Sequence, residues 1–335
     1  MKGGQYRNRT GNRAGRLELA SNSAIRQIAT SYEGSVFAAA DAERAVHIFT
    51  LDQPAEVTGF ETIFEFGGQR LAISPGGTFC VTGAYNRDGV ALYETNGGSL
   101  IWHRKDLRGV QRLQFSRHED AVLASLEGGP LLLLDSRTGA TLRDLPGVMD
   151  IEESPFGRAK LVCNSARYVF RDENRVIDLE VKPLGHFCRA AFTETSVIVE
   201  VVQAAARPLG WRGPREQRFG LACCSITDGR VIWQRMLRPG VNAQRLAFAE
   251  DENEVVAVVW PFVRGGNKKM IYLDPVTGDL RREVGLNGAP YDTVFARRGR
   301  ILVTSNGEII SVGDGRLVRS IELPEVRDPE DRGIP

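Results

Sequence analysis

Apolar residues in this chain fall into short runs separated by turn-forming residues. Most runs span only a few positions, as in Val36–Ala40, Val122–Leu126 and Val255–Trp260. Runs of this length, bounded by Gly, Pro, Asn and Asp, are typical of β-strands, and no stretch shows the spacing of an amphipathic helix. None approaches the ~20 apolar residues that a membrane-spanning helix requires. The pattern therefore predicts a chain built almost entirely of strands.

One strand–turn–strand motif recurs along the chain, with glycine in its turn. Its clearest copies are Leu92–Trp102, Leu134–Leu142, Ser225–Trp233, Leu273–Leu280 and Val312–Val318. A tight hairpin turn needs a residue with positive φ, which glycine adopts without strain. Each copy therefore predicts a β-hairpin.

The turn glycines recur at nearly regular intervals. They are Gly98, Gly139, Gly229, Gly278 and Gly315. The steps between them are about 41, 90, 49 and 37 residues, and the double step indicates a degenerate copy. We assign this copy to Tyr168–Leu179, with Asn174 at a left-handed turn position that asparagine tolerates. A looser first copy at 45–54 brings the number of copies to seven, and this period is typical of a solenoid or a propeller.

Each repeat contains four strands in the order inner strand, second strand and hairpin. The second repeat shows this plan over 70–104 and the third over 110–145. Seven such repeats predict an all-β fold, a seven-bladed β-propeller of four-stranded antiparallel blades. We expect the propeller to span 21–323. Residues 1–20 would form a basic arm with a strand that could close the ring, and 324–335 an acidic, proline-containing tail.

The region 21–323 resembles the β-propeller superfamily of WD40-like and quinoprotein-like repeats. The resemblance rests on the Asp-x-x-Thr-Gly hairpins at Asp135–Gly139 and Asp274–Gly278, and on the Gly-x-x-x-Trp strands at Gly98–Trp102 and Gly229–Trp233. These features are closer to the quinoprotein type, because the Trp-Asp dipeptide of WD40 blades is absent. The resemblance implies a rigid propeller and identifies no member family.

The chain lacks the common catalytic and metal-binding signatures. Its four histidines are scattered over different repeats, so we predict no catalytic residue, no metal and no cofactor. The adjacent Cys223 and Cys224 need separate consideration, because a few quinone-dependent propeller enzymes place a vicinal disulfide beside the cofactor. Here the pair lies in a strand, where alternate side chains face opposite ways. We expect the five cysteines to be buried reduced thiols.

Charge and composition narrow the class of partner and the compartment. The formal net charge is only +1, which argues against general nucleic-acid binding. The first residues lack the apolar stretch of a secretory signal, so we expect a cytoplasmic protein that does not engage a membrane. Most of the 43 basic residues are arginine, and with the abundance of Ala and Gly this indicates a bacterial source with a GC-rich genome.

Two over-long loops are the most informative irregularities. The fifth repeat carries Gln203–Arg218 and the sixth carries 261–269, each between the second and third strands. Equivalent loops of neighbouring blades project from one face, so their basic and aromatic side chains should gather there. The predicted partner-binding residues are Tyr85, Arg87, Arg207, Trp211, Arg212, Arg215, Arg218, Phe262, Arg264, Lys268 and Lys269. Exposed aromatics among arginines are typical of protein interfaces, and they also suit single-stranded nucleic acid or a small anionic ligand.

These observations favour a non-enzymatic module that docks a partner protein with an acidic surface. An inhibitor or immunity protein and a scaffold subunit both fit that description. The alternatives are a propeller enzyme (a hydrolase, lyase or oxidoreductase) with its site at the channel mouth, and a nucleic-acid-binding propeller. The enzyme predicts convergent His, Asp or Glu residues, or a metal, on the channel axis. The binding module predicts a channel lined by small or apolar residues and a basic–aromatic patch off the axis.

Overall fold

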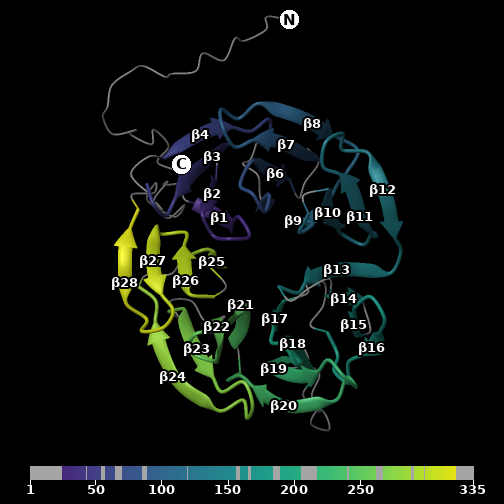
Figure 1. The fold of residues 1–335 in the computed structure, drawn as a ribbon. Helices are drawn as coiled ribbons and strands as arrows, with labels where there is room; N and C mark the ends of the chain where they lie inside the picture. Colours follow the sequence, from purple (N-terminus) through teal and green to yellow (C-terminus); the bar gives the residue numbers. More distant parts are fainter. Residues whose placement is uncertain are drawn as a thin grey trace, which may run out of the picture.

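In the computed structural model, the described residues form 28 strands in seven four-stranded sheets. It describes residues 25–42, 44–53, 57–64, 70–84, 89–118, 120–155, 159–164, 167–183, 189–204, 217–239, 241–261, 267–287, 290–297 and 299–321. The described residues form no helix, and hence none that could cross a bilayer. The predicted seven-bladed propeller of four-stranded blades is confirmed (Figure 1).

Blades 1 to 4 occupy the first half of the chain. Their strands are β1 (Ile25–Thr30), β2 (Val36–Asp41), β3 (Ala45–Thr50) and β4 (Thr58–Glu61); β5 (Arg70–Ile73), β6 (Phe79–Gly83), β7 (Val90–Glu94) and β8 (Leu100–Arg104); β9 (Val110–Phe115), β10 (Ala121–Leu126), β11 (Leu131–Asp135) and β12 (Thr141–Leu145); β13 (Val148–Glu153), β14 (Lys160–Asn164), β15 (Tyr168–Arg171) and β16 (Val176–Asp178).

Blades 5 to 7 follow the same plan, with longer strands in blades 5 and 6. Their strands are β17 (Ala190–Phe192), β18 (Ser196–Ala204), β19 (Gln217–Ser225) and β20 (Val231–Met236); β21 (Val241–Ala249), β22 (Glu254–Pro261), β23 (Lys269–Leu273) and β24 (Leu280–Gly285); β25 (Thr293–Ala296), β26 (Ile301–Thr304), β27 (Glu308–Ser311) and β28 (Leu317–Ser320).

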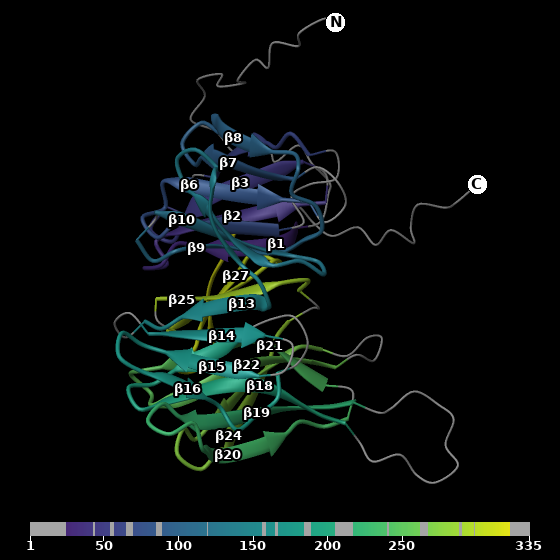
Figure 2. The same ribbon diagram turned by 90° about the vertical axis from the view of Figure 1, so that its right-hand side faces the viewer.

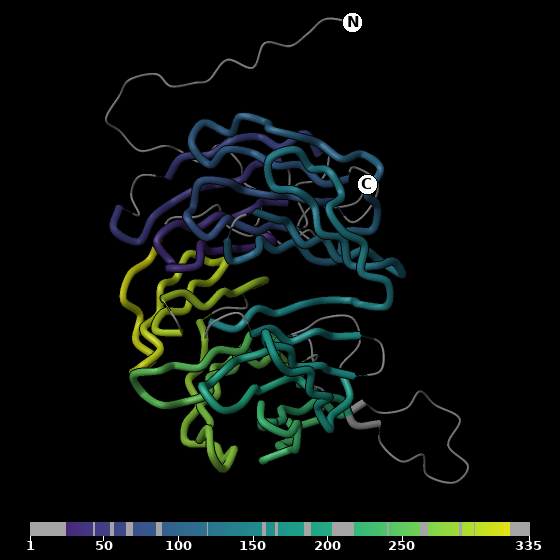
Figure 3. The backbone as a smooth tube through the Cα atoms, turned by 45° about the vertical axis from the view of Figure 1, so that its right-hand side comes forward, coloured from purple at the N-terminus to yellow at the C-terminus, as the bar shows by residue number. Residues whose placement is uncertain are grey.

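Each sheet pairs its four strands antiparallel and in chain order, with the first strand nearest the ring axis (Figure 1). The last blade meets the first through buried side chains that include Ile28, Phe37 and Val303. A hydrogen bond from the Ile28 amide to the Asp292 carboxylate, at 3.2 Å, crosses the same junction. The yellow and purple ends of the chain therefore lie side by side in the tube of Figure 3. The predicted ring-closing strand at 17–20 lies outside the described residues.

The recurring hairpins join the third and fourth strands of their blades, as the repeat predicted. The turn glycines have positive φ in all five clear copies, between +68° and +79°. Asn174 differs from the prediction, because it does not adopt a positive φ. Its turn is held instead by Asp172, whose carboxylate accepts hydrogen bonds from the amides of Asn174 and Arg175 at 2.9 and 2.7 Å. A side-chain acceptor here replaces the left-handed residue.

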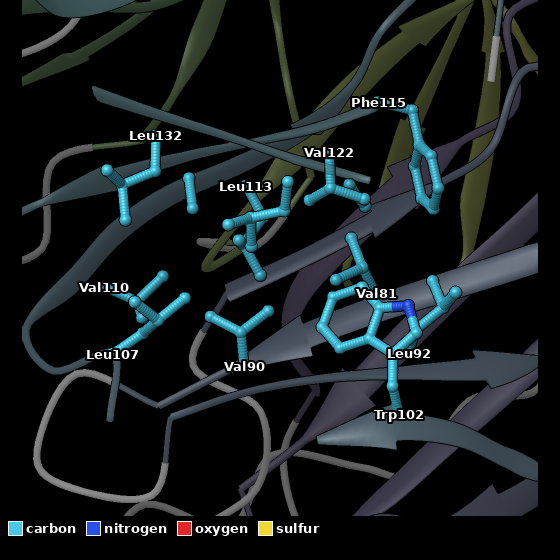
Figure 4. Packing of buried hydrophobic residues seen from close by; sticks show 13 residues of the cluster. Val81, Val90, Leu92, Trp102, Leu107, Val110, Leu113, Phe115, Val122 and Leu132 are labelled. Carbon is cyan, nitrogen blue, oxygen red and sulfur yellow. The ribbon is translucent and has the colours of Figure 1, made fainter. Parts of the chain in front are cut away.

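The two repeated motifs pack against one another across the blade boundaries. Trp102 of β8 donates its indole N–H to a carbonyl of the next blade's glycine turn at 3.0 Å, and Trp233 of β20 does the same at 2.9 Å. A Cβ added to Gly139 or Gly278 would lie 2.8 or 2.6 Å from these rings. Glycine is therefore required both by the positive φ and by the close approach of the tryptophan. Figure 4 shows Trp102 within the apolar cluster between blades 2 and 3.

Apolar clusters fill each of the seven junctions between neighbouring blades, so the core is distributed around the ring. Figure 2 shows the ribbon of this ring from the side. Among the described residues, the junction between blades 3 and 4 has the fewest buried apolar side chains, namely Leu123, Leu131, Ile151, Val162 and Val169. Ion pairs of Arg112 also cross this junction. Electrostatic contacts therefore supplement its small apolar cluster.

Four cysteines are buried free thiols, as the sequence predicted. Cys223 packs in the junction between blades 5 and 6, whereas Cys224 packs between blades 4 and 5. The two side chains thus face opposite sides of their sheet. Burial raises the pKa of Cys224, like that of Cys163, to about 12. Cys188 lies outside the described residues.

Candidate interaction site at the channel mouth

The first strands of the blades surround a central channel with a cavity of about 850 Å³. Its wall differs from the small or apolar lining predicted for a binding module. Six arginines contribute to it: Arg26, Arg70, Arg112, Arg117, Arg189 and Arg245. The prediction was wrong because these strands are edge strands beside an open channel, so long polar side chains can reach water there. Among the described residues no group of three or more His, Cys, Asp or Glu could hold a metal ion.

Arg112 of β9 joins blade 3 to blade 4 through two carboxylates. Its guanidinium lies 2.5 Å from Asp150 and 2.5 Å from Glu152, both on β13. Burial would lower the pKa of Arg112, but the two carboxylates outweigh it and hold the pKa above its usual value. Burial raises the pKa of Glu152, against the opposing effect of Arg112. The two ion pairs of Arg112 therefore stabilise the junction between blades 3 and 4, which has the fewest buried apolar side chains among the described residues.

Two further ion pairs line the same wall. Arg189 lies 3.0 Å from Glu200 and donates to the carbonyl of Ala243 in blade 6 at 2.7 Å. Arg245 lies 2.9 Å from Asp292, which leads into β25 of blade 7. Burial lowers the pKa of Arg189, and the nearby positive charge of Arg245 adds to that effect, while Glu200 opposes it. These arginines are thus already engaged in holding neighbouring blades together.

Two exposed aromatic side chains stand at one mouth of the channel, each with a cation over its ring. Trp260 is 38% exposed and Tyr291 is 42% exposed. The Arg26 guanidinium lies 4.4 Å from the centre of the Tyr291 ring, and the Lys268 ammonium lies 5.0 Å from that of Trp260. Lys268 also donates to the carbonyl of Tyr291 at 3.0 Å. We call these four residues the aromatic mouth.

The aromatic mouth lies on the face where second strands end and third strands begin. Trp260 is near the end of β22, and Lys268 directly precedes β23. Tyr291 precedes β25, and Arg26 is near the start of β1. The predicted insertions Gln203–Arg218 and 261–269 connect strands at this same face. Residues 205–216 and 262–266 of these insertions lie outside the described part of the chain.

An apolar pocket of about 370 Å³ opens beside the aromatic mouth, between blades 5 and 6. Its apolar wall is formed by Met236, Leu237, Val241, Val259, Pro261, Ile271 and Leu280. Arg235, Arg238 and Lys269 also line it, and Glu283 of the same lining pairs with Lys269. The face therefore combines aromatic, apolar and basic groups within neighbouring blades.

The structure describes three of the predicted partner-binding residues. Lys268 is buried, at 1% exposure, and belongs to the aromatic mouth. Lys269 is exposed, lines the apolar pocket and lies 3.1 Å from Glu283. Arg218 is exposed near the start of β19. The other predicted residues lie outside the described residues, so their gathering on this face stays a prediction: Tyr85, Arg87, Arg207, Trp211, Arg212, Arg215, Phe262 and Arg264.

Sequence reasoning missed three members of the aromatic mouth. Trp260 was assigned to the apolar run that forms β22, and nothing in the sequence distinguished Tyr291 or Arg26 from ordinary loop residues. One local signal was present, because Pro261 follows Trp260 and proline commonly marks the end of a strand. The grouping of these residues could not be predicted locally, because only the closure of the ring brings blades 6, 7 and 1 together.

Comparison with known proteins supports the fold and goes no further. No family model matches the chain, and no curated protein matches it. Two similar solved structures each have a TM-score of 0.59 and 12% identity. One is the dihydro-heme d1 dehydrogenase NirN in complex with DHE, which covers 89% of this chain; this chain spans 66% of its length, just under two thirds. The other is the Cps50 (Swd1) β-propeller domain of Myceliophteria thermophila, covering 88% of this chain and 94% of that domain.

The fold is a β-propeller. Similarity at 12% identity does not show that this chain shares the activity of either protein, because the propeller scaffold hosts many unrelated functions. The site itself must therefore support any proposal about function.

Proposed function

We propose that this protein is a non-enzymatic binding module that docks a partner protein through the face carrying the aromatic mouth. The observation that carries the proposal is the exposure of Trp260 and Tyr291 beside two cations. Trp, Tyr and Arg are the residues most enriched among those that dominate binding energy at protein interfaces. Their rings offer a large apolar surface whose conformation is already restrained by the stacked cations.

The neighbouring apolar pocket supports the same proposal. A cavity of about 370 Å³ lined by Val241, Val259 and Ile271 could receive an apolar side chain of the partner. The basic groups around it, together with Arg26 and Lys268, would favour a partner whose surface is acidic. Equal numbers of the two proteins in the complex would fit an inhibitor or immunity protein, whereas several partners at once would fit a scaffold subunit.

Affinity purification from the source organism tests this function. The tagged chain, expressed at its native level, would be recovered from the cytoplasmic fraction, where we expect it, at physiological salt. We expect a stoichiometric protein partner with wild type and a loss of about tenfold or more in its recovery with the double variant Trp260→Ala, Tyr291→Ala.

A matched control stands at the opposite mouth of the channel. Tyr32 also lines the channel and has a stacked arginine, Arg117, 4.9 Å from its ring centre. The Tyr32→Ala variant should recover the partner as wild type does. Equal recovery by the double variant, or a loss confined to Tyr32→Ala, would contradict the proposal.

A further inference from the structure

Three arginines of the channel have a carboxylate partner, whereas two cations at the aromatic mouth have none among the described residues. Arg112, Arg189 and Arg245 form the ion pairs described above. Among the described residues no carboxylate lies within ion-pair distance of Arg26 or Lys268. Arg26 contacts the Tyr291 ring, and Lys268 contacts the Tyr291 carbonyl and the Trp260 ring. The positive charge of the mouth is therefore satisfied by aromatic faces and one carbonyl oxygen.

Burial makes an anionic partner more important for Lys268 than for Arg26. The side chain of Lys268 is almost wholly buried, yet the described residues offer one hydrogen-bond acceptor to the three N–H donors of its ammonium. Burial lowers its pKa to about 8, with Asp292 opposing that effect and Arg245 adding to it. A buried cation is stabilised by an anion that accepts its remaining hydrogen bonds.

Asp292 is not placed to supply that anion. One of its oxygens accepts from Arg245 at 2.9 Å, and the other accepts from the Ile28 amide at 3.2 Å. Its charge is thus committed to closing the ring between blades 6, 7 and 1. Among the described residues, therefore, no carboxylate is free to pair with Arg26 or Lys268.

We propose that Arg26 and Lys268 form a carboxylate-binding site at the aromatic mouth, which receives an Asp or Glu side chain from an acidic segment of the partner protein. The inference rests on the proposed function, because it names the chemistry by which that face recognises its partner. The carboxylate would accept from both cations, while the rings of Trp260 and Tyr291 pack against the apolar part of the segment.

Charge on the channel wall favours a carboxylate over a phosphate. Glu152, Glu153 and Asp292 lie on the wall close to the arginines, so a dianion entering the channel meets negative charge as well as positive. A single carboxylate needs only the two cations at the mouth. Nucleic acid would need a run of basic groups along the face, and the net charge of the chain is only +1.

A fluorescent hexaglutamate peptide, titrated into the full-length protein and followed by anisotropy, tests the site. We expect binding that a hexaglutamine peptide does not reproduce and that weakens between 50 and 150 mM salt. Lys268→Met, or Arg26→Gln, should weaken it about tenfold. The matched control is Lys269→Met, which removes the neighbouring exposed lysine and should change the affinity less than twofold. Thermal unfolding of each variant checks that it is folded.

The pH dependence provides a second readout. The groups that face Lys268 are Asp292, Arg245, Trp260 and Tyr291. The protonated ammonium binds the carboxylate, so wild-type affinity should fall as the pH rises through about 8 and beyond. A Lys268→Arg variant keeps its charge and should show no such fall. An identical profile for wild type and Lys268→Arg would overturn the role of Lys268.

The failures of the two proposals are distinguishable. If hexaglutamate does not bind while partner recovery still depends on Trp260 and Tyr291, the carboxylate site is wrong and the docking face stands. If hexaglutamate binds through Lys268 but partner recovery does not depend on Trp260 and Tyr291, the docking proposal is wrong and the anion site stands. Equal competition by inorganic phosphate at millimolar concentration would overturn the preference for a carboxylate.

Discussion

Replacing Trp102 with alanine is expected to lower the free energy of unfolding by about 3–5 kcal/mol. The indole is only 8% exposed and fills the junction between blades 2 and 3 (Figure 4). Its loss would leave a cavity against Gly139, and the carbonyl of Ser136 would lose its donor. Urea denaturation measures the effect as a lower midpoint at an unchanged slope.

Leu100 supplies the control for Trp102 on the same strand. It is 46% exposed, so Leu100→Ala should change the free energy of unfolding by no more than about 0.5 kcal/mol. Trp102→Phe keeps an aromatic ring in the junction but removes the N–H donor, and should fall between the two. If Trp102→Ala and Leu100→Ala have equal effects, the tryptophan–glycine contact does not join the blades.

Replacing Arg112 with alanine is expected to cost about 3 kcal/mol at pH 7. This is the lower end of the range for breaking a buried pair, because the side chains of Arg112 and Glu152 are each 27% exposed. Asp150 and Glu152 would then face each other without their shared cation. The pKa of Glu152 is already raised by burial, and losing Arg112 would raise it further. A carboxyl group with a raised folded-state pKa destabilises the fold above that pKa and is relieved below it. The stability deficit of Arg112→Ala should therefore shrink as the pH falls from 7 to 5.

Two variants separate the lost pair from a general effect of losing charge. Arg143 is exposed on β12 of the same blade, and Arg143→Gln should leave stability within about 0.5 kcal/mol of wild type at both pH values. Combining Arg112→Met with Asp150→Asn and Glu152→Gln removes the uncompensated charges and should restore most of the loss. A pH-independent deficit in Arg112→Ala would show that electrostatics do not hold this junction.

The fold was predictable because its determinants are local and repeated. Each hairpin needs glycine at a positive-φ turn, and the spacing of Gly98, Gly139 and their equivalents counts the blades directly. Asn174 shows where this reasoning stops. The position of that turn was predicted correctly, but its conformation depends on the Asp172 side chain, which a comparison with glycine turns does not reveal.

The candidate site was less predictable because it forms only when the ring closes. Trp260, Lys268, Tyr291 and Arg26 come from blades 6, 7 and 1, and no stretch of sequence shows them together. Each also had a plausible local role, Trp260 as the last residue of an apolar run. The arginine-lined channel was missed for the same reason, since polar residues in an inner strand are unremarkable until the strands surround a common axis.

The most direct test of the account is site-specific photo-crosslinking in the source organism. A photoreactive phenylalanine analogue would replace Tyr291 in one strain and Tyr32, at the opposite mouth, in another. The account predicts one protein crosslinked in high yield from position 291 and none from position 32. Crosslinking from position 32 alone, or from neither position, would contradict the claim that the aromatic mouth is where this propeller meets its partner.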